Sequence, residues 1–257
     1  MPATVHQFLC LEDNFGVLVH DEASGATAAI DAPEAAAVER ALSETGWKLT
    51  DIVVTHHHSD HTAGIPALKR NHGCRVVAPR AEAARIGTAD ETVADGDTVK
   101  VGSLTARVLE TPGHTAGHVS YWFEADRLAF VGDTLFSIGC GRVIEGDAAM
   151  MWNSLCKLRA LPDDTVFYCG HEYTKANIAF ALTIDPDNAA LKRRANEVEA
   201  LRAQGKATLP ATIGAEKAAN PFLRADDPNL ASRLGLSGRP PAEVFAKIRG
   251  AKDTFRG

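Results

Sequence analysis

The most constraining feature of this 257-residue chain is an alternation of short β-branched runs with helical stretches, which continues to about residue 170. Strands are predicted where β-branched runs lie between turn residues, and helices where apolar residues recur at helical spacing. The predicted strands span 27–31, 51–55, 75–78, two segments within 98–110, 119–123, 128–131 and 165–168. The predicted helices span 33–45, 63–71 and a segment that begins after the N-cap residue Asp147. Strands interleaved with helices indicate a layered α/β domain.

The pattern changes beyond Tyr173, where strand signals stop. One helix is predicted over residues 189–204, which places Leu191, Val198 and Leu201 on one face, and a last short helix is predicted over 242–249. We therefore expect two parts, an α/β domain over residues 1–172 and a helical domain over 173–257.

Composition excludes several classes of protein. With 45% hydrophobic and 23% charged residues the chain is globular. No window approaches the roughly 18 consecutive apolar residues of a membrane span, and the N-terminus lacks the basic and apolar regions of a signal peptide, so we expect a cytoplasmic protein without membrane contact. The five cysteines are scattered, without a Cys-x-x-Cys pair, and indicate neither a disulfide framework nor a thiolate zinc site.

Charge is unevenly distributed. Residues 1–172 carry 13 Lys and Arg against 24 Asp and Glu, a balance of −11, whereas residues 173–257 carry 14 against 9, a balance of +5. A basic C-terminal third is compatible with an anionic partner or with an ordinary solvated surface.

Four of the ten histidines lie between Thr55 and His61, directly after a predicted strand. In an extended segment alternate side chains share a face, so His56, His58 and Asp60 can converge while His57 points away. His61 can reach an adjacent position as the chain turns into the next helix. Imidazole and carboxylate ligands suit zinc, iron or manganese.

Further metal-ligand candidates follow other strands, each after a glycine that permits a sharp turn: His114, Asp133 and His171. A single catalytic metal usually takes three protein ligands. Seven candidates therefore predict a two-metal site with a bridging carboxylate.

These residues resemble the metallo-β-lactamase superfamily, whose His-x-His-x-Asp-His signature is present from His56 to His61. The similarity to the glyoxalase II, or hydroxyacylglutathione hydrolase, family covers nearly the whole chain. It includes the matching segments at 13–15, 111–115, 132–136, 139–142, 170–174 and 220–222, with Arg249 and Lys252–Asp253. The segments at 139–142 and 170–174 and the C-terminal basic residues select this family within the superfamily.

The resemblance implies an αββα sandwich followed by a helical glutathione-binding domain. It assigns His56, His58 and His114 to one divalent metal, Asp60, His61 and His171 to the other, and Asp133 to the bridge between them. Zinc is favoured, with iron or manganese as alternatives. Asp60 and Asp133 also receive catalytic roles, because the implied reaction is attack on a thioester by a hydroxide that bridges the metals.

The implied substrate is S-(2-hydroxyacyl)glutathione, typically S-D-lactoylglutathione, cleaved to glutathione and a 2-hydroxy acid in the second step of methylglyoxal detoxification. The implied substrate-binding residues are Arg142, Ile144, His171, Tyr173, Arg249 and Lys252. Ile144 departs from the family, which often has an aromatic residue there. The cationic side chains would pair with the carboxylates of glutathione.

Three other functions remain open: a glutathione-persulfide dioxygenase of the same superfamily, which uses one iron, an RNA-processing nuclease, and a glutathione-binding module without catalysis. The C-terminal basic residues argue against the dioxygenase, and the lack of an aromatic-interleaved basic run argues against RNA. We expect a monomeric thioester hydrolase whose partner is a small molecule and not a nucleic acid.

Overall fold

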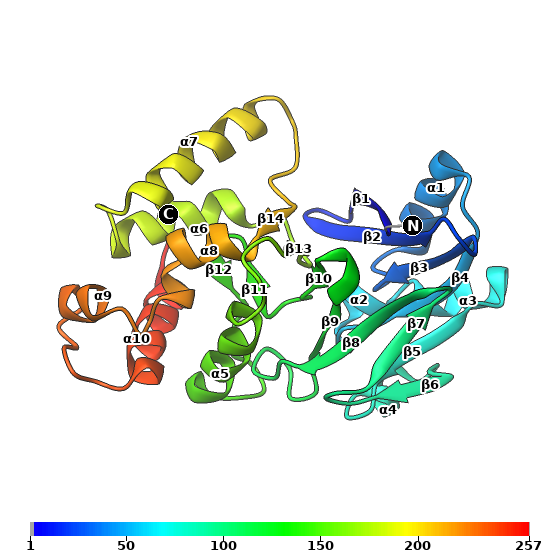
Figure 1. Cartoon of the computed structure of the whole chain (residues 1–257), viewed down its shortest axis with the longest axis horizontal. Coiled ribbons are helices and arrows are strands. Elements are labelled where there is room, and N and C mark those ends of the chain that lie inside the picture. The colour runs from blue at the N-terminus through cyan, green and yellow to red at the C-terminus, as the bar shows by residue number, and fades with distance from the viewer. Residues whose placement is uncertain (1–2, 257) are drawn as a thin grey trace. The chain divides into compact units, whose positions relative to one another are not determined.

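The computed structural model describes residues 3–256, and the chain divides into two compact units (Figure 1). The first unit comprises the chain up to Glu110 together with Gly117–Gly132. The second comprises Thr111–Ala116 and the chain from Asp133 onward. The short segment Thr111–Ala116 therefore groups with the C-terminal part, although it follows a strand of the first unit directly.

A six-stranded sheet forms one layer of the first unit, with the strand order β1-β2-β3-β4-β5-β6. Its strands are β1 (Thr4–Cys10), β2 (Asn14–Asp21), β3 (Ala26–Ile30), β4 (Leu49–Val53), β5 (Arg75–Pro79) and β6 (Glu91–Val93). The first three strands pair antiparallel and the last four pair parallel. Since β3 and β4 are parallel neighbours, the residues that follow each of them emerge at the same edge of the sheet.

Helices connect the parallel strands of this sheet (Figure 1). They are α1 (Ala35–Thr45), α2 (Ser59–Thr62), α3 (Ile65–His72) and α4 (Ala83–Ile86). Val38 of α1 and Leu68 of α3 lie in one buried apolar cluster with Ile52 and Val76 of the sheet. This burial of helix faces against β-branched strand residues stabilises the layer and holds the carboxyl ends of the strands in place.

The first unit also contains a run of antiparallel strands, β7 (Thr98–Val101), β8 (Leu104–Glu110), β9 (Val119–Phe123) and β10 (Leu128–Phe130), with the 3-10 helix η1 (Glu124–Asp126) between the last two. Buried and exposed residues alternate along the first half of β8, as expected for a strand with one covered face. Phe123 and Phe130 meet edge to face, with ring centroids 5.6 Å apart.

The second unit is mainly helical. Its helices are α5 (Ala148–Arg159), α6 (Thr174–Ile184), α7 (Ala189–Ala203), α8 (Ile213–Ala219), α9 (Pro228–Arg233), α10 (Pro241–Thr254) and the 3-10 helix η2 (Pro221–Leu223). Two short antiparallel pairs complete it, β11 (Leu135–Phe136) with β12 (Gly139–Cys140) and β13 (Val166–Tyr168) with β14 (Ala211–Thr212).

Two apolar groupings hold the second unit together. Ile178, Leu191 and Val198 pack α6 against α7, and Ile138 joins them from the β11–β12 turn. Phe222 lies between Phe180 and Phe245, with ring centroids 5.9 and 6.1 Å apart, which links η2 to α6 and α10. Both groupings bury aromatic or branched side chains, the residues that contribute most to a small core.

The structure confirms the α/β fold class and most of the predicted elements. The expectation that strands end at Tyr173 was wrong for the two residues of β14, which are strand only because they pair with β13. Helix α6 was missed because six of its eleven residues are buried and its apolar face is correspondingly wide. No helix within residues 3–256 combines the length and the apolarity needed to cross a membrane.

Candidate metal centre

The histidine-rich segment begins where β4 ends. The Tyr121 hydroxyl donates to the Val54 carbonyl at 2.6 Å, and the Val119 amide donates to the Thr55 carbonyl at 3.0 Å. Both bonds keep the chain extended beyond the last residue of the strand. Burial raises the pKa of the Tyr121 phenol well above its ordinary value, so this hydroxyl remains a donor. The segment that carries the histidines is therefore held at its start by the neighbouring strand β9.

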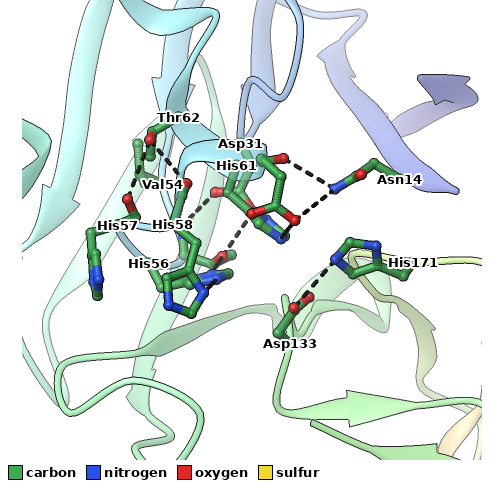
Figure 2. Close-up of polar contacts among 12 residues, drawn as sticks. Asn14, Asp31, Val54, His56, His57, His58, His61, Thr62, Asp133 and His171 are labelled. Carbon is green, nitrogen blue, oxygen red and sulfur yellow. Dashed lines mark hydrogen bonds and ion pairs between the residues drawn. The ribbon is translucent and has the colours of Figure 1, made fainter. Parts of the chain in front are cut away.

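Within this segment His56 and His58 approach each other, while His57 does not join them (Figure 2). The Nε2 atom of His56 lies 3.1 Å from Nδ1 of His58. The other ring nitrogen of His56, Nδ1, lies 3.0 Å from the hydroxyl oxygen of Thr55. The His57 ring instead lies 2.9 Å from the Glu82 carboxylate. In an extended chain successive side chains point to opposite faces, so His56 and His58 share one face and His57 lies on the other.

His61 is oriented by Asp31, which follows β3 (Figure 2). One carboxylate oxygen of Asp31 lies 2.9 Å from Nδ1 of His61 and accepts from the Thr55 hydroxyl at 2.8 Å, and the other accepts from the Thr55 amide at 2.7 Å. A carboxylate beside Nδ1 favours the tautomer with its proton there, which leaves the lone pair of Nε2 for a metal.

Asp60 is held from the other side by Asn14, the first residue of β2 (Figure 2). The side-chain amide of Asn14 donates to the Asp60 backbone carbonyl at 3.1 Å and to its carboxylate at 3.3 Å. The same carboxylate lies 3.8 Å from Nε2 of His61. An amide donor on one oxygen limits the rotation of a side chain that is 41% exposed.

Glu82 anchors the middle of the histidine segment. Its buried carboxylate accepts from the His57 amide at 2.6 Å and from the Gly117 amide at 3.0 Å. Glu82 thereby ties the backbone between His56 and His58 to the chain that leads into β9. The contact involves the main chain of His57, so it fixes the two neighbouring histidines whatever the His57 ring does.

The second unit contains another group of the predicted ligands. Nε2 of His114 and Nε2 of His171 lie 3.4 and 3.3 Å from the same carboxylate oxygen of Asp133. Figure 2 shows the pair formed by Asp133 and His171. All three side chains are buried. Nδ1 of His114 lies 3.0 Å from the Arg142 carbonyl oxygen, so its proton belongs on Nδ1, which leaves the lone pair of Nε2 for a metal.

Gly141 makes this group sterically possible. A Cβ atom at this position would lie 1.9 Å from the carbonyl oxygen of Asp133, far inside van der Waals contact. The Gly141 amide donates to the Thr134 carbonyl at 3.2 Å, which holds the two chain segments together. A glycine is therefore required at position 141, because any side chain there would collide with the backbone of Asp133.

Three of the predicted substrate residues lie near this group in the second unit. The Tyr173 ring stacks on His171, with centroids 4.7 Å apart and an angle of 4° between the planes. Arg142 holds His114 through its backbone carbonyl and leaves its own side chain exposed. Ile144 is 50% exposed and donates its amide to Gly113, the residue before His114.

The other two predicted substrate residues lie on α10 and have different surroundings. Arg249 is buried: its guanidinium donates to the Cys140 carbonyl at 3.0 Å, pairs with Asp253 at 2.9 Å and lies over the Phe222 ring. The ammonium of Lys252 donates to the Ala176 carbonyl at 3.1 Å and lies 5.4 Å from the centre of the Phe180 ring. Burial, and to a smaller extent Arg249, lowers the pKa of Lys252.

The donor sets in the two units fit divalent metals. Four donors lie in the first unit and three in the second, all imidazole nitrogens or carboxylate oxygens. Two of the histidines have a carboxylate or carbonyl oxygen at Nδ1, the arrangement typical of metal ligands. Burial raises the pKa of the nearby Cys140 thiol to about 11, which keeps it protonated and leaves nitrogen and oxygen as the ligand atoms. These His and Asp groups fit a dimetal site.

Sequence reasoning missed Asp31 and Glu82. Asp31 had a detectable signal, since it is the last residue of one predicted strand and the histidine segment follows another, and parallel pairing of β3 with β4 brings the two strand ends together. Glu82 had none, because it lies at the start of a four-residue helix and reaches His57 only through the folded chain.

Comparison with known proteins shows the family to which the chain belongs. The model of the metallo-beta-lactamase superfamily matches residues 23–171, and the model of the hydroxyacylglutathione hydrolase C-terminus matches residues 172–255. A hydroxyacylglutathione hydrolase of Rhodopseudomonas palustris (strain CGA009) is 62% identical, and one of Bradyrhizobium sp. (strain ORS 278) is 58% identical. Each alignment covers 98% of this chain and 99% of the relative.

Among solved structures, ETHE1 from Myxococcus xanthus is similar with a TM-score of 0.70 at 28% identity, covering 98% of this chain and 92% of that chain. The matches confirm the predicted fold class, a metallo-β-lactamase domain followed by a helical C-terminal domain. Because both family models match in this order and the curated relatives align over almost their whole length, the chain belongs to the hydroxyacylglutathione hydrolase family within the metallo-β-lactamase superfamily.

Proposed function

We propose that this protein hydrolyses S-(2-hydroxyacyl)glutathione thioesters, typically S-D-lactoylglutathione, to glutathione and the corresponding 2-hydroxy acid. Family membership across both domains supports this reaction. The observation that carries it is the position of Arg142, whose backbone carbonyl orients His114. One loop thereby joins a metal-ligand candidate to a candidate substrate contact.

The proposed metal ligands are His56, His58 and His114 for one ion and Asp60, His61 and His171 for the other, with Asp133 as the bridge. Two divalent ions, for which we propose zinc, would lower the pKa of a shared water toward neutrality and polarise the thioester carbonyl. Among the protein's own groups, Asn14 limits the rotation of the Asp60 carboxylate, and Asp31 keeps the proton of His61 on Nδ1. Both contacts keep the donor atoms ordered before substrate arrives.

The substrate's glutathione part would be bound by cationic groups of the second unit. Within residues 3–256 the Lys252 ammonium donates to the Ala176 carbonyl, and because an ammonium can donate three hydrogen bonds it can also donate to a glutathione carboxylate. Arg249 already bonds Cys140 and Asp253, so its contribution includes holding that segment in place. The leaving thiolate needs no dedicated acid because a thiol titrates near ~8.5.

We further propose a monomeric, cytoplasmic enzyme with residues 1–172 as the metal domain and 173–257 as the substrate-binding domain.

The decisive experiment is a thioesterase assay of the purified protein on S-D-lactoylglutathione, with elemental analysis of the same sample. The expected result is release of glutathione by protein that holds two metal ions per chain, with zinc predominating. Asp133→Ala should abolish turnover. Protein that holds two metals but leaves the thioester intact would refute the proposal. One iron per chain, with oxygen consumed in the presence of glutathione persulfide, would instead identify a persulfide dioxygenase.

A further inference from the structure

A buried polar group in the second unit lies outside the proposed metal ligands. Glu216 of α8 is 1% exposed, and its carboxylate accepts three hydrogen bonds. The donors are the Ser137 hydroxyl at 2.8 Å, the Ile138 amide at 2.7 Å and the Asn220 side-chain amide at 2.9 Å. Two of the three donors belong to the turn between β11 and β12. Removing a carboxylate from water is costly unless such donors replace the water. The turn must therefore keep the conformation in which Ser137 and Ile138 donate to Glu216.

Asn220 bonds the backbone of the same turn. Its side-chain amide is 3.3 Å from the Phe136 carbonyl and 3.0 Å from the Gly139 carbonyl, the two residues that face each other across the β11–β12 pair. Its side-chain oxygen accepts from the Phe222 amide at 3.0 Å, so Asn220 is also the N-cap residue of η2. The Asn220-Pro221-Phe222 segment, noted in the sequence without a role, thus connects this turn to the C-terminal helices.

The turn needs this support because its backbone is strained. Ile138 has φ of +55°, a left-handed conformation that β-branched residues rarely adopt. Such strain costs on the order of 1–3 kcal/mol and persists only where the surroundings enforce it. Here the Ile138 amide is held by Glu216, and its side chain is buried among Ile178, Leu191 and Val198. A Cβ at Gly139 would lie 2.4 Å from the side-chain amide nitrogen of Asn177, so a larger residue there would displace the Asn177 side chain, which donates to the Ser137 carbonyl.

The turn leads directly into the proposed substrate-binding segment. The residue after Gly139 is Cys140, whose carbonyl accepts from the buried guanidinium of Arg249 at 3.0 Å. Two residues further, Arg142 exposes its side chain and holds His114 through its carbonyl. A shift of the turn by a fraction of an ångström would therefore move the carbonyl that anchors Arg249 and change the direction in which the exposed Arg142 side chain leaves the segment.

We propose that Glu216 and Asn220 are positioning residues for the glutathione part of the substrate. They hold the turn Phe136–Gly139 in its strained conformation and thereby set the placement of Arg142 and Arg249. This inference rests on the proposed thioesterase function and adds residues that act through the turn without touching the reacting atoms. Loss of either residue should weaken recognition of glutathione more than it weakens the hydrolytic step.

The test compares two thioesters in the metal-loaded enzyme: S-D-lactoylglutathione and the D-lactoyl thioester of N-acetylcysteamine, which lacks the glutathione carboxylates. Glu216→Ala removes all three acceptor contacts. It should raise KM for the glutathione thioester about tenfold, as expected for a displaced charge-assisted hydrogen bond, and change kcat by less than about twofold. For the truncated thioester kcat/KM should stay at the wild-type value, and two metals per chain should remain.

Three further variants complete the experiment. Glu216→Gln keeps an acceptor for the Ile138 amide and should restore a near wild-type KM. Asn220→Asp exchanges the donor that faces Phe136 and Gly139 for an acceptor, and should repeat the KM effect even if Glu216→Ala fails to fold. Glu199→Gln, an exposed carboxylate of α7, is the matched control and should have no effect.

The outcomes separate the inference from the proposed function. An equal loss of kcat/KM on both thioesters would mean a general structural role and would overturn the inference. An unchanged KM in folded Glu216→Ala and Asn220→Asp would do the same. Wild-type protein that cleaves neither thioester would count against the proposed function itself.

Discussion

At the scale of single residues, the candidate site depends on side chains that orient other side chains. Asp31 has φ of +58° and is buried, which is tolerable for aspartate because its short side chain can bond locally in this conformation. That conformation directs its carboxylate to both Thr55 and His61. The strained residue therefore lies beside His61, a proposed metal ligand that would require a fixed tautomer.

The first prediction concerns Asp31→Asn. The variant keeps an oxygen for the Thr55 amide and tolerates the positive φ, but loses the negative charge beside His61. Metal affinity is expected to fall by roughly 10–100-fold, the usual effect of losing an outer partner of a ligand histidine. Competition with a chromophoric chelator measures it. Glu44→Gln, an exposed carboxylate, serves as the control, and equal affinities in both variants would contradict the role of Asp31.

The second prediction concerns the pH dependence of substrate recognition through Lys252. Its pKa is lowered, chiefly by burial, so its ammonium loses the proton at a lower pH than an exposed lysine. Below that pKa the charge is present and can pair with a glutathione carboxylate, and above it the charge is lost. KM for S-D-lactoylglutathione should therefore rise with increasing pH. The rise should begin at a lower pH than the pH at which an exposed lysine titrates.

A charge-preserving variant tests this interpretation. Lys252→Arg keeps the cation at all accessible pH values, so the alkaline rise in KM should disappear. The kinetic profile between pH 7 and 10 of wild type and variant, measured at constant ionic strength, provides the comparison. A rise of equal size in Lys252→Arg would assign the titration to another group.

At the scale of secondary-structure elements, caps and turns decide where each segment begins. Helix α5 begins at Asp147, whose carboxylate accepts from the Met150 amide at 2.8 Å, as its N-cap pattern predicted. The carboxylate also complements the positive end of the helix dipole. The helix supports the second unit through Ser154, which donates to the Pro112 carbonyl at 2.6 Å, two residues before His114.

The third prediction follows from this cap. Asp147→Ala should lower the free energy of unfolding by about 1 kcal/mol, because the Met150 amide loses its acceptor in the folded state. Asp147→Asn keeps an acceptor oxygen and should lose less. Urea unfolding followed by circular dichroism measures both. Identical midpoints for the Ala and Asn variants would show that the side-chain cap contributes nothing.

At the scale of the whole molecule, the chain crosses between its two compact units more than once. The segment Thr111–Ala116 lies between two stretches of the first unit and belongs to the second. The seven proposed ligands are distributed in the same way, four in the first unit and three in the second. Metal binding by these ligands should therefore be coupled to folding, because the donor atoms bind an ion only when the folded chain holds them in place.

The fourth prediction follows from this coupling. Removal of metal by a chelator should lower the thermal midpoint by several degrees, because a ligand present at ~1,000 times its Kd stabilises the folded state by about 4 kcal/mol. Restoring zinc should restore the midpoint. Differential scanning calorimetry on wild type and Asp133→Ala measures the effect. A shift of equal size in the variant would show that the stabilising metal does not involve Asp133.

Much of the architecture was predictable from local patterns. The strands from β3 to β5 and from β7 to β10 follow β-branched runs between turn residues, and α1, α5 and α7 follow helical spacing with recognisable ends. Strands β1 and β2 were not predicted, and α10 extends to Thr254, five residues beyond its predicted end. The division at residues 172 and 173 stays a prediction.

The sequence by itself determined the family, the fold class and the types of ligand, because strand-end histidines and carboxylates are visible as a local pattern. Only the tertiary structure decided what surrounds them. Asp31 bonds His61 because β3 and β4, the strands that precede them, are parallel neighbours. Glu82 bonds the His57 amide from the start of α4. Glu216 bonds the Ile138 amide although 78 residues separate them in sequence. Such contacts depend on packing between segments distant in sequence, and a local pattern carries no record of them.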